Sequence, residues 1–112
     1  MEREIPHMIP DKKMPGQKIK ISESEITKQI RDYLKIRQIF HWKVMQGLGA
    51  TPGIADILGI YKGKPLAIEV KTAKGKPSEN QLAFLARFRT EGGIAFIARS
   101  VDDVIEGLKY EN

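Results

Sequence analysis

The sequence predicts an α/β protein in which a small mixed sheet is flanked by helices, with the element order α-β-β-β-α-β-α. Apolar residues recur at helical spacing in three segments, and four short segments alternate or run apolar as strands do. A strand, a helix and a strand follow one another over residues 65–99, an order that favours a parallel crossover. The 112 residues suffice for one hydrophobic core but not for two, so we expect a single domain.

The N-terminal segment, residues 1–20, contains three prolines and several charges without any period, and we interpret it as an arm that precedes a domain of residues 21–112. It lacks the pattern of a signal peptide, and no apolar run approaches the roughly 18 residues of a membrane helix. The chain has no cysteine, which excludes disulfides and thiolate zinc sites and fits a reducing compartment. We therefore expect a cytoplasmic protein with no membrane partner.

The first helix is predicted over residues 22–38, because apolar side chains recur there at helical spacing and Ser22 is a favourable cap. Residues 39–45 alternate between apolar and polar side chains, which predicts a strand with Trp42 in the core. The three glycines and one proline of residues 46–53 exclude a regular element there.

Two short apolar runs, residues 54–60 and 65–71, predict a β-hairpin around the tight turn Lys62-Gly63. The remaining elements are expected as a helix within residues 78–92, a strand at 94–99 and a closing helix within 100–110. Serines at the start of both helices are their expected caps.

Three charged residues gather at one end of this hairpin. Glu69 and Lys71 point to the same face of their strand, and antiparallel pairing lays Asp56 beside Glu69. Two neighbouring carboxylates repel, and oxygen ligands of this kind suit Mg²⁺ or Mn²⁺. With a lysine beside them to hold a water or a phosphoryl oxygen, they can hydrolyse a phosphodiester with the help of a metal ion.

The bare spacing is common, since an aspartate followed by (D/E)-x-K arises by chance about one time in three in a chain of this length. Asp11 and Lys13 in the arm form a similar D-x-K pattern. Glu69 and Lys71 also have a simpler interpretation as a salt bridge. Glu25 and Gln81 each follow a helix-opening serine by three residues, which fits a capping box.

Gln81 has a further feature, because it lies on the face of its helix that is expected to pack on the sheet. An inward-facing amide needs a hydrogen-bond partner. The end of the strand that carries Glu69 and Lys71 is the nearest candidate.

These residues together resemble the PD-(D/E)xK nuclease superfamily, and within it the virus-type replication-repair nucleases (VRR-NUC), which include small stand-alone members of phages and bacteria. The matching pieces are Glu25, Gly53-Ile54-Ala55-Asp56 for G-x-x-D, Ile68-Glu69-Val70-Lys71 for I-E-x-K, and Ser78 to Gln81 at the start of a helix. They span residues 22 to about 100, and Ala55 stands where the superfamily has proline.

The resemblance implies a restriction-endonuclease-like fold and a metal-dependent DNA endonuclease with Mg²⁺ or Mn²⁺ as its cofactor. The roles that it implies are metal binding for Asp56, Glu69 and Val70, catalysis for Lys71, an additional acidic group for Glu25 and a positioning role for Gln81. Stand-alone members resemble Holliday-junction resolvases, so branched DNA and a homodimer are the expected partners. A phage-encoded protein that acts in a host cell fits this resemblance.

The net charge of +5 agrees with a polyanionic partner. The candidate phosphate contacts are Lys12, Lys13, Lys18, Lys20, Lys62, Lys64, Lys74 and Lys76. Three alternatives to a junction-selective nuclease remain: a nuclease acting on flaps, ends or single strands within a larger assembly, a non-catalytic nucleic-acid-binding module, and a structural domain with a surface ion pair.

Overall fold

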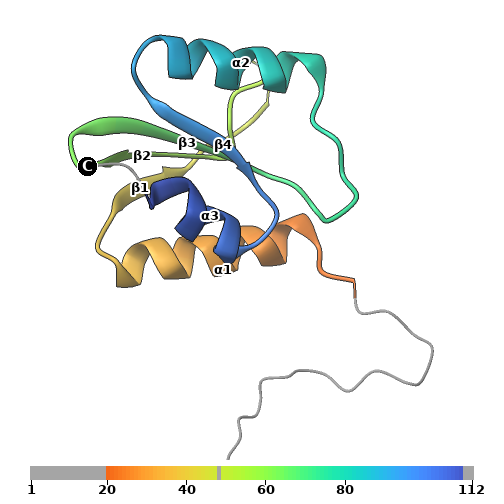
Figure 1. Ribbon diagram of the computed structural model, residues 1–112. Coiled ribbons are helices and arrows are strands. Elements are labelled where there is room, and N and C mark those ends of the chain that lie inside the picture. The colour runs from red at the N-terminus through yellow and green to blue at the C-terminus, as the bar shows by residue number, and fades with distance from the viewer. Residues whose placement is uncertain (1–19, 48, 110–112) are drawn as a thin grey trace, which may run out of the picture.

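The structure is a computed structural model that describes residues 20–47 and 49–109 of the chain. Its elements are α1 (Glu23–Ile36), β1 (Phe40–Lys43), β2 (Ile57–Tyr61), β3 (Lys64–Val70), α2 (Glu79–Thr90), β4 (Ile94–Ala98) and α3 (Val101–Leu108). This order confirms the predicted α-β-β-β-α-β-α arrangement (Figure 1). The arm predicted for residues 1–20 lies almost wholly outside the described residues, and the division of the chain into arm and domain stays a prediction.

The four strands form one mixed sheet in the order β1-β2-β3-β4. β1 and β2 are antiparallel, as are β2 and β3. β3 and β4 are parallel neighbours, and α2 is the segment of the chain that connects them. Lys62 and Gly63 both have positive φ, at 52° and 82°, as a type I′ hairpin turn requires. This turn sets the register in which Ile57 faces Ile68, so the next residues along, Asp56 and Glu69, become neighbours.

The helices cover the two faces of the sheet unequally (Figure 1). α1 and α3 pack on one face over a core that includes Ile30, Leu34, Leu66, Ile68 and Val104, all fully buried. α2 lies on the other face above a smaller cluster of Ala55, Ala67, Leu85 and Ala95. No helix in the described part of the chain is long and apolar enough to cross a membrane.

The part of the α2 face formed by β1 and β2 is left uncovered, because α2 packs over β3 and β4. Phe40 and Trp42 of β1 are 68% and 43% exposed, and their rings contact each other with centroids 5.5 Å apart. Ile60 of β2 faces Phe40 and is also exposed. The prediction that Trp42 lies in the core is therefore wrong, because alternation fixes which side chains share a face but not whether a helix covers it.

Each helix begins at a serine whose hydroxyl accepts a hydrogen bond from the amide three residues on: Ser22 from Glu25, Ser78 from Gln81 and Ser100 from Asp103. At α2 the bond is reciprocal, since the Gln81 side chain accepts from the Ser78 amide at 2.8 Å. The caps therefore fix where α2 begins, and with it the position of Gln81.

Candidate functional site

The hairpin register brings Asp56 to the end of β3. Asp56 Oδ2 accepts a hydrogen bond of 2.8 Å from the Val70 amide, and its Oδ1 accepts one of 3.1 Å from Gln46 Nε2. The Asp56 side chain is thus held beside β3 from both directions, and its carboxylate is only partly buried.

Glu69 is the most unusual residue of the site, because it is a carboxylate that is only 2% exposed. Its Oε2 accepts a 2.8 Å hydrogen bond from Gln81 Nε2 and lies 3.5 Å from Lys71 Nζ. Its Oε1 is buried and has no hydrogen-bond partner in the part of the chain that the structure describes. One oxygen is therefore fully engaged while the other is left unsatisfied, an arrangement that costs free energy in a folded protein.

Burial, together with the negative charge of Asp56, raises the pKa of Glu69 from 4.5 to about 7. Lys71 lowers the pKa of Glu69 through its positive charge and its hydrogen bond, but this offsets the rise only in part. The positive charge of Lys71 therefore neutralises the Glu69 carboxylate only in part.

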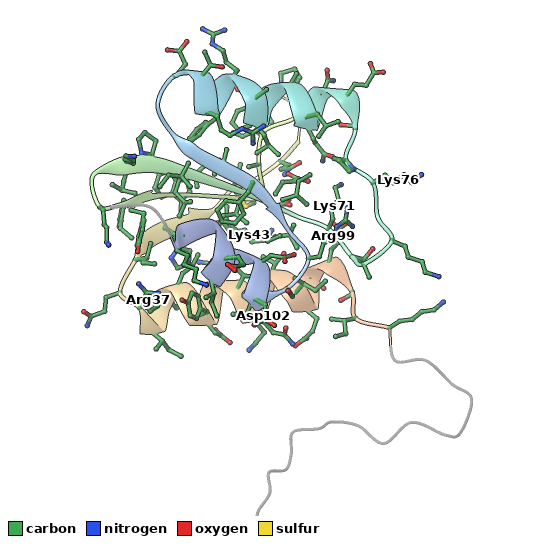
Figure 2. The ribbon with its side chains drawn as sticks, in the orientation of Figure 1. Arg37, Lys43, Lys71, Lys76, Arg99 and Asp102 are labelled. Carbon is green, nitrogen blue, oxygen red and sulfur yellow. The ribbon has the colours of Figure 1, made fainter. Side chains whose placement is uncertain are left out.

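Lys71 follows β3 directly, is itself largely buried with 13% of its side chain exposed, and lies on the same side as Glu69. The loop after it is held by Arg99, whose Nη1 donates to the carbonyls of Thr72, Ala73 and Gly75. Figure 2 shows Arg99 beside Lys71, with Lys76 further along the loop. Arg99 comes from the end of β4, so the parallel strand pair organises this loop.

Gly53 explains why the segment before Asp56 can approach α2. Its φ is +72°, and a Cβ placed there would lie 2.2 Å from the carbonyl oxygen of Asn80 and 2.8 Å from the amide of Gln81. Only glycine allows both this left-handed backbone and this close contact. The G-x-x-D segment and the start of α2 are therefore locked against each other, which places Asp56 and Gln81 around Glu69.

The structure brings four of the residues singled out in the sequence, Asp56, Glu69, Lys71 and Gln81, to one place. Glu25 is exposed, as is Glu23 two residues before it, and the additional acidic role that the resemblance implies for Glu25 stays a prediction. Glu23, not Glu25, is the α1 carboxylate whose charge acts on Glu69, raising its pKa.

The charge of Glu23 acts on Glu69 because Glu23 lies on the side of α1 that faces the sheet. Glu23 continues the buried stripe of Ile26, Thr27 and Ile30 toward the N-terminus, at offsets of three, four and seven residues. Glu25 belongs to the opposite, solvent-facing side. The inward stripe is visible in the sequence and is the signal that would have identified Glu23.

The predicted DNA-contacting lysines fall into three groups. Lys12, Lys13 and Lys18 lie outside the described residues. Lys20, Lys74 and Lys76 are exposed, and the last two lie on the loop after Lys71. Lys62 and Lys64 sit at the turn of the hairpin, about 17 Å from its Asp56 end at the usual rise per strand residue.

Two further residues of the site, Gln46 and Arg99, were not predicted. Gln46 follows β1 in the glycine-rich stretch, and its amide reaches Asp56 and the Ile54 carbonyl because that stretch lies beside the segment that precedes β2. Arg99 follows the last strand and contacts main-chain carbonyls, which leave no pattern in the sequence.

The site fits a divalent cation on its chemistry. Asp56 and Glu69 supply hard oxygen donors, and the buried, unpartnered Glu69 Oε1 is an acceptor that a cation would satisfy. In the described ranges 20–47 and 49–109 no group of three or more histidine, cysteine, aspartate or glutamate side chains is placed to hold a metal ion. The donor set is therefore two carboxylates plus backbone and water oxygens, as Mg²⁺ prefers.

Fold and site together define a small mixed α/β domain with a carboxylate–lysine cluster at one end of its two central strands, β2 and β3. No protein-family model matches the sequence, and no curated protein matches it. Solved structures do match. One titled "VRR_NUC domain" superposes with a TM-score of 0.66 at 24% identity, over 80% of this chain and 97% of its own.

A second solved structure, titled "VRR_NUC domain protein", superposes with a TM-score of 0.67 at 21% identity, covering 81% of this chain and 88% of its own. The chain therefore has the fold of VRR_NUC domains. This confirms the predicted fold class, and it confirms the resemblance read from the sequence motifs at the level of the fold.

Proposed function

We propose that this chain is a metal-dependent deoxyribonuclease that hydrolyses phosphodiester bonds at the cluster of Asp56, Glu69 and Lys71. The observation that carries the proposal is the buried Glu69 carboxylate, whose Oε1 has no partner among the described residues and whose pKa is raised despite the neighbouring lysine. The VRR_NUC fold supports the same conclusion, since its name denotes a nuclease.

Asp56, Glu69 and the main-chain carbonyl of Val70 would hold the ion, with Mg²⁺ or Mn²⁺ the fitting choice for oxygen donors. When bound, such an ion polarises the phosphate and lowers the pKa of a coordinated water. Asp56 is already oriented by the Val70 amide, and the Gln81 amide holds one oxygen of Glu69, which leaves the other oxygen for the ion.

Lys71 is the group that faces the reacting phosphate in this proposal. Its ammonium is restrained by Glu69 at 3.5 Å and is shielded from solvent, which strengthens its interaction with negative charge that develops in the transition state. Water adds to the phosphorus and gives up a proton, while the bond from phosphorus to the leaving oxygen breaks and that oxygen takes up a proton. Lys71 orients the water or stabilises the developing charge. Gln81 acts as a positioning residue through Glu69.

The test is cleavage of a labelled DNA with Mg²⁺, with Mn²⁺ and with EDTA. We expect metal-dependent cleavage that Glu69→Gln and Lys71→Ala each reduce by at least about 100-fold while DNA binding is retained. Glu91→Gln is the matched control, because Glu91 is an exposed carboxylate paired with Arg87 on the far end of α2. Absence of cleavage with either metal on every DNA form, or full activity of Glu69→Gln, would contradict the proposal.

We further propose that the enzyme acts on branched DNA, in the manner of a Holliday-junction resolvase, as a homodimer. The dimer is supported by the uncovered apolar surface of Phe40, Trp42 and Ile60, which exposes on the order of 300 Å². A second copy buries such a surface in a two-fold contact, as the apolar centre of an interface of about 800 Å² per partner. Flap or single-strand cleavage is the alternative activity.

The oligomeric state and the cleavage pattern test this finer proposal separately. We expect the protein to sediment as a dimer at micromolar concentration and Phe40→Ser with Trp42→Ser to sediment as a monomer. A four-way junction should give paired symmetric nicks, with a linear duplex as the control. A wild-type monomer overturns the dimer, and equal cleavage of duplex and junction overturns the selectivity, while the nuclease proposal survives both results.

A further inference from the structure

A second basic surface lies on the α1 side of the sheet, away from the lysines predicted to contact DNA. A shallow groove of about 290 Å³ runs between α1 and the edge strand β1. The cations that line it are Lys28, Arg31 and Lys35 of α1 and Lys43 of β1, and Asp32 is the one acidic residue in its lining. We call this surface the α1–β1 basic groove.

Two of these cations have no partner among the residues that the structure describes. Lys28 pairs with Asp32 at 3.1 Å, and Arg31 Nε donates to His41 Nε2 at 3.4 Å. The ammonium groups of Lys35 and Lys43 make no hydrogen bond or ion pair within residues 20–47 and 49–109, and both side chains are exposed. The groove thus carries three net positive charges that no acidic side chain in its lining neutralises.

The spacing of the cations fits an extended polyanion better than a single small anion. Lys28, Arg31 and Lys35 stand at offsets of three and four residues, so they form one row along the helix. From Ser24 to Lys35 the groove wall extends about 16 Å along the helix axis, which matches about five nucleotides of rise along one strand.

The groove reaches the end of the sheet that carries the candidate active site. At the α1 end, Ser24 follows Glu23, whose charge acts on the pKa of Glu69. On the β1 side, Lys43 pairs with Ile57, the residue directly after Asp56. Lys43 shares the α1 face of the sheet with Ile57, whereas Glu69 contacts Gln81 of α2 on the other face. A strand whose phosphate is held at Asp56 and Glu69 would therefore pass around this end of the sheet to enter the groove.

We propose that the α1–β1 basic groove binds the phosphate backbone of the DNA strand that runs to or from the active site, with Lys35 and Lys43 as its principal phosphate contacts. This inference rests on the proposed nuclease function for its ligand class. It adds a DNA-binding surface on the opposite side of the sheet from α2. Such contacts position the substrate without reading its sequence.

The test measures DNA binding without cleavage. A fluorescein-labelled duplex and a single-stranded oligonucleotide are titrated in EDTA between about 50 and 200 mM salt, and Kd is followed by anisotropy. The variant Lys35→Gln with Lys43→Gln removes two phosphate contacts, so the slope of log K against log salt falls by about 1.8 for duplex or about 1.4 for single strands. The Kd is expected to weaken on the order of tenfold or more at about 0.1 M salt.

The matched control is Arg87→Gln with Lys109→Gln, which removes the same total charge from two cations that do not line the groove and that pair with Glu91 and Glu106. We expect its Kd to stay within about twofold of wild type. A thermal melt confirms that both double variants fold, since exposed substitutions change stability little. Wild-type slope and Kd in the groove variant overturn the inference, as does an equal loss in the control.

The outcome is separable from that of the nuclease proposal because the readout needs no metal and no chemistry. Weakened binding in the groove variant, together with no cleavage by the wild-type protein, supports the groove and rejects the nuclease. Metal-dependent cleavage by the wild-type protein, together with unchanged DNA binding in the groove variant, supports the nuclease and rejects the groove.

Discussion

Replacing Glu69 by glutamine tests the electrostatics of the site without changing its shape. The carbonyl of the introduced glutamine can take the place of Oε2 and still accept from Gln81 and Lys71, and its amide can take the place of the unpartnered Oε1. The substitution therefore removes one buried negative charge and leaves the existing hydrogen bonds possible.

The magnitude follows from the raised pKa. A rise from 4.5 to about 7 corresponds, at about 1.4 kcal/mol per pKa unit, to about 3 kcal/mol. Because the folded protein binds the proton more tightly than the unfolded chain, stability is lost as the pH rises from about 4.5 to about 7. The Glu69→Gln variant lacks this loss, so it should match wild type at about pH 5 and exceed it by up to about 3 kcal/mol at about pH 8.

The assay is urea unfolding of both proteins at pH 5 and pH 8, first in EDTA and then with Mg²⁺. At pH 8, Mg²⁺ is expected to stabilise wild type, by about 2.7 kcal/mol at one hundred times its Kd, and to stabilise Glu69→Gln much less. Glu91→Gln serves as the exposed-carboxylate control. If wild type and Glu69→Gln keep the same difference at both pH values, Glu69 ionises normally and the argument from burial fails.

Three further changes test the groups around Glu69. Gly53→Ala should lower the free energy of unfolding by about 2 kcal/mol or more, measured by urea unfolding, and should also abolish cleavage, because its Cβ displaces the start of α2. Arg99→Gln should lower cleavage about tenfold and increase proteolysis of the loop after Lys71, since it removes the side chain that holds three carbonyls. Glu23→Gln should lower the pKa of Glu69, as followed by NMR, whereas Glu25→Gln should leave it unchanged.

Each of these predictions has an internal control. Gly49→Ala carries the same kind of backbone strain, with φ of +88°, but has nothing within 4 Å, so the excess cost at Gly53 measures the contact with α2. Arg87→Gln removes an exposed arginine from α2 and should leave the loop unaffected. Equal losses at the two glycines, or at the two arginines, would contradict the roles assigned to Gly53 and Arg99.

The central pair of carboxylates was predictable from the sequence because a tight turn fixes hairpin register. Once Lys62 and Gly63 form the turn, Asp56 and Glu69 are placed side by side with no further information. The burial of Glu69 was not predictable in the same way, since it depends on how α2 and the segment at Gly53 close over the strand.

The prediction for Trp42 was wrong because the sequence does not determine which part of the sheet a helix covers. Trp42 was assigned to the core because alternation gives a strand two faces, but whether α2 reaches β1 depends on tertiary packing. The role of Glu25 came from matching a motif and stays a prediction, while the α1 carboxylate whose charge acts on the pKa of Glu69 is Glu23. The groove that Lys35 and Lys43 line could not be predicted from the sequence, because the two residues come together only when β1 folds back against α1.

The structure also bears on the alternative in which Glu69 and Lys71 form an ordinary salt bridge. A pair that neutralises itself lowers the pKa of its carboxylate, yet the pKa of Glu69 is raised, because burial and Asp56 outweigh a lysine that lies 3.5 Å away. Lys71 contacts the oxygen that Gln81 already holds, and the other oxygen has no partner among the described residues. A stabilising ion pair has no use for a second carboxylate or an unsatisfied oxygen, whereas both can serve as ligands of a cation, and this difference favours the metal-dependent function over the structural one.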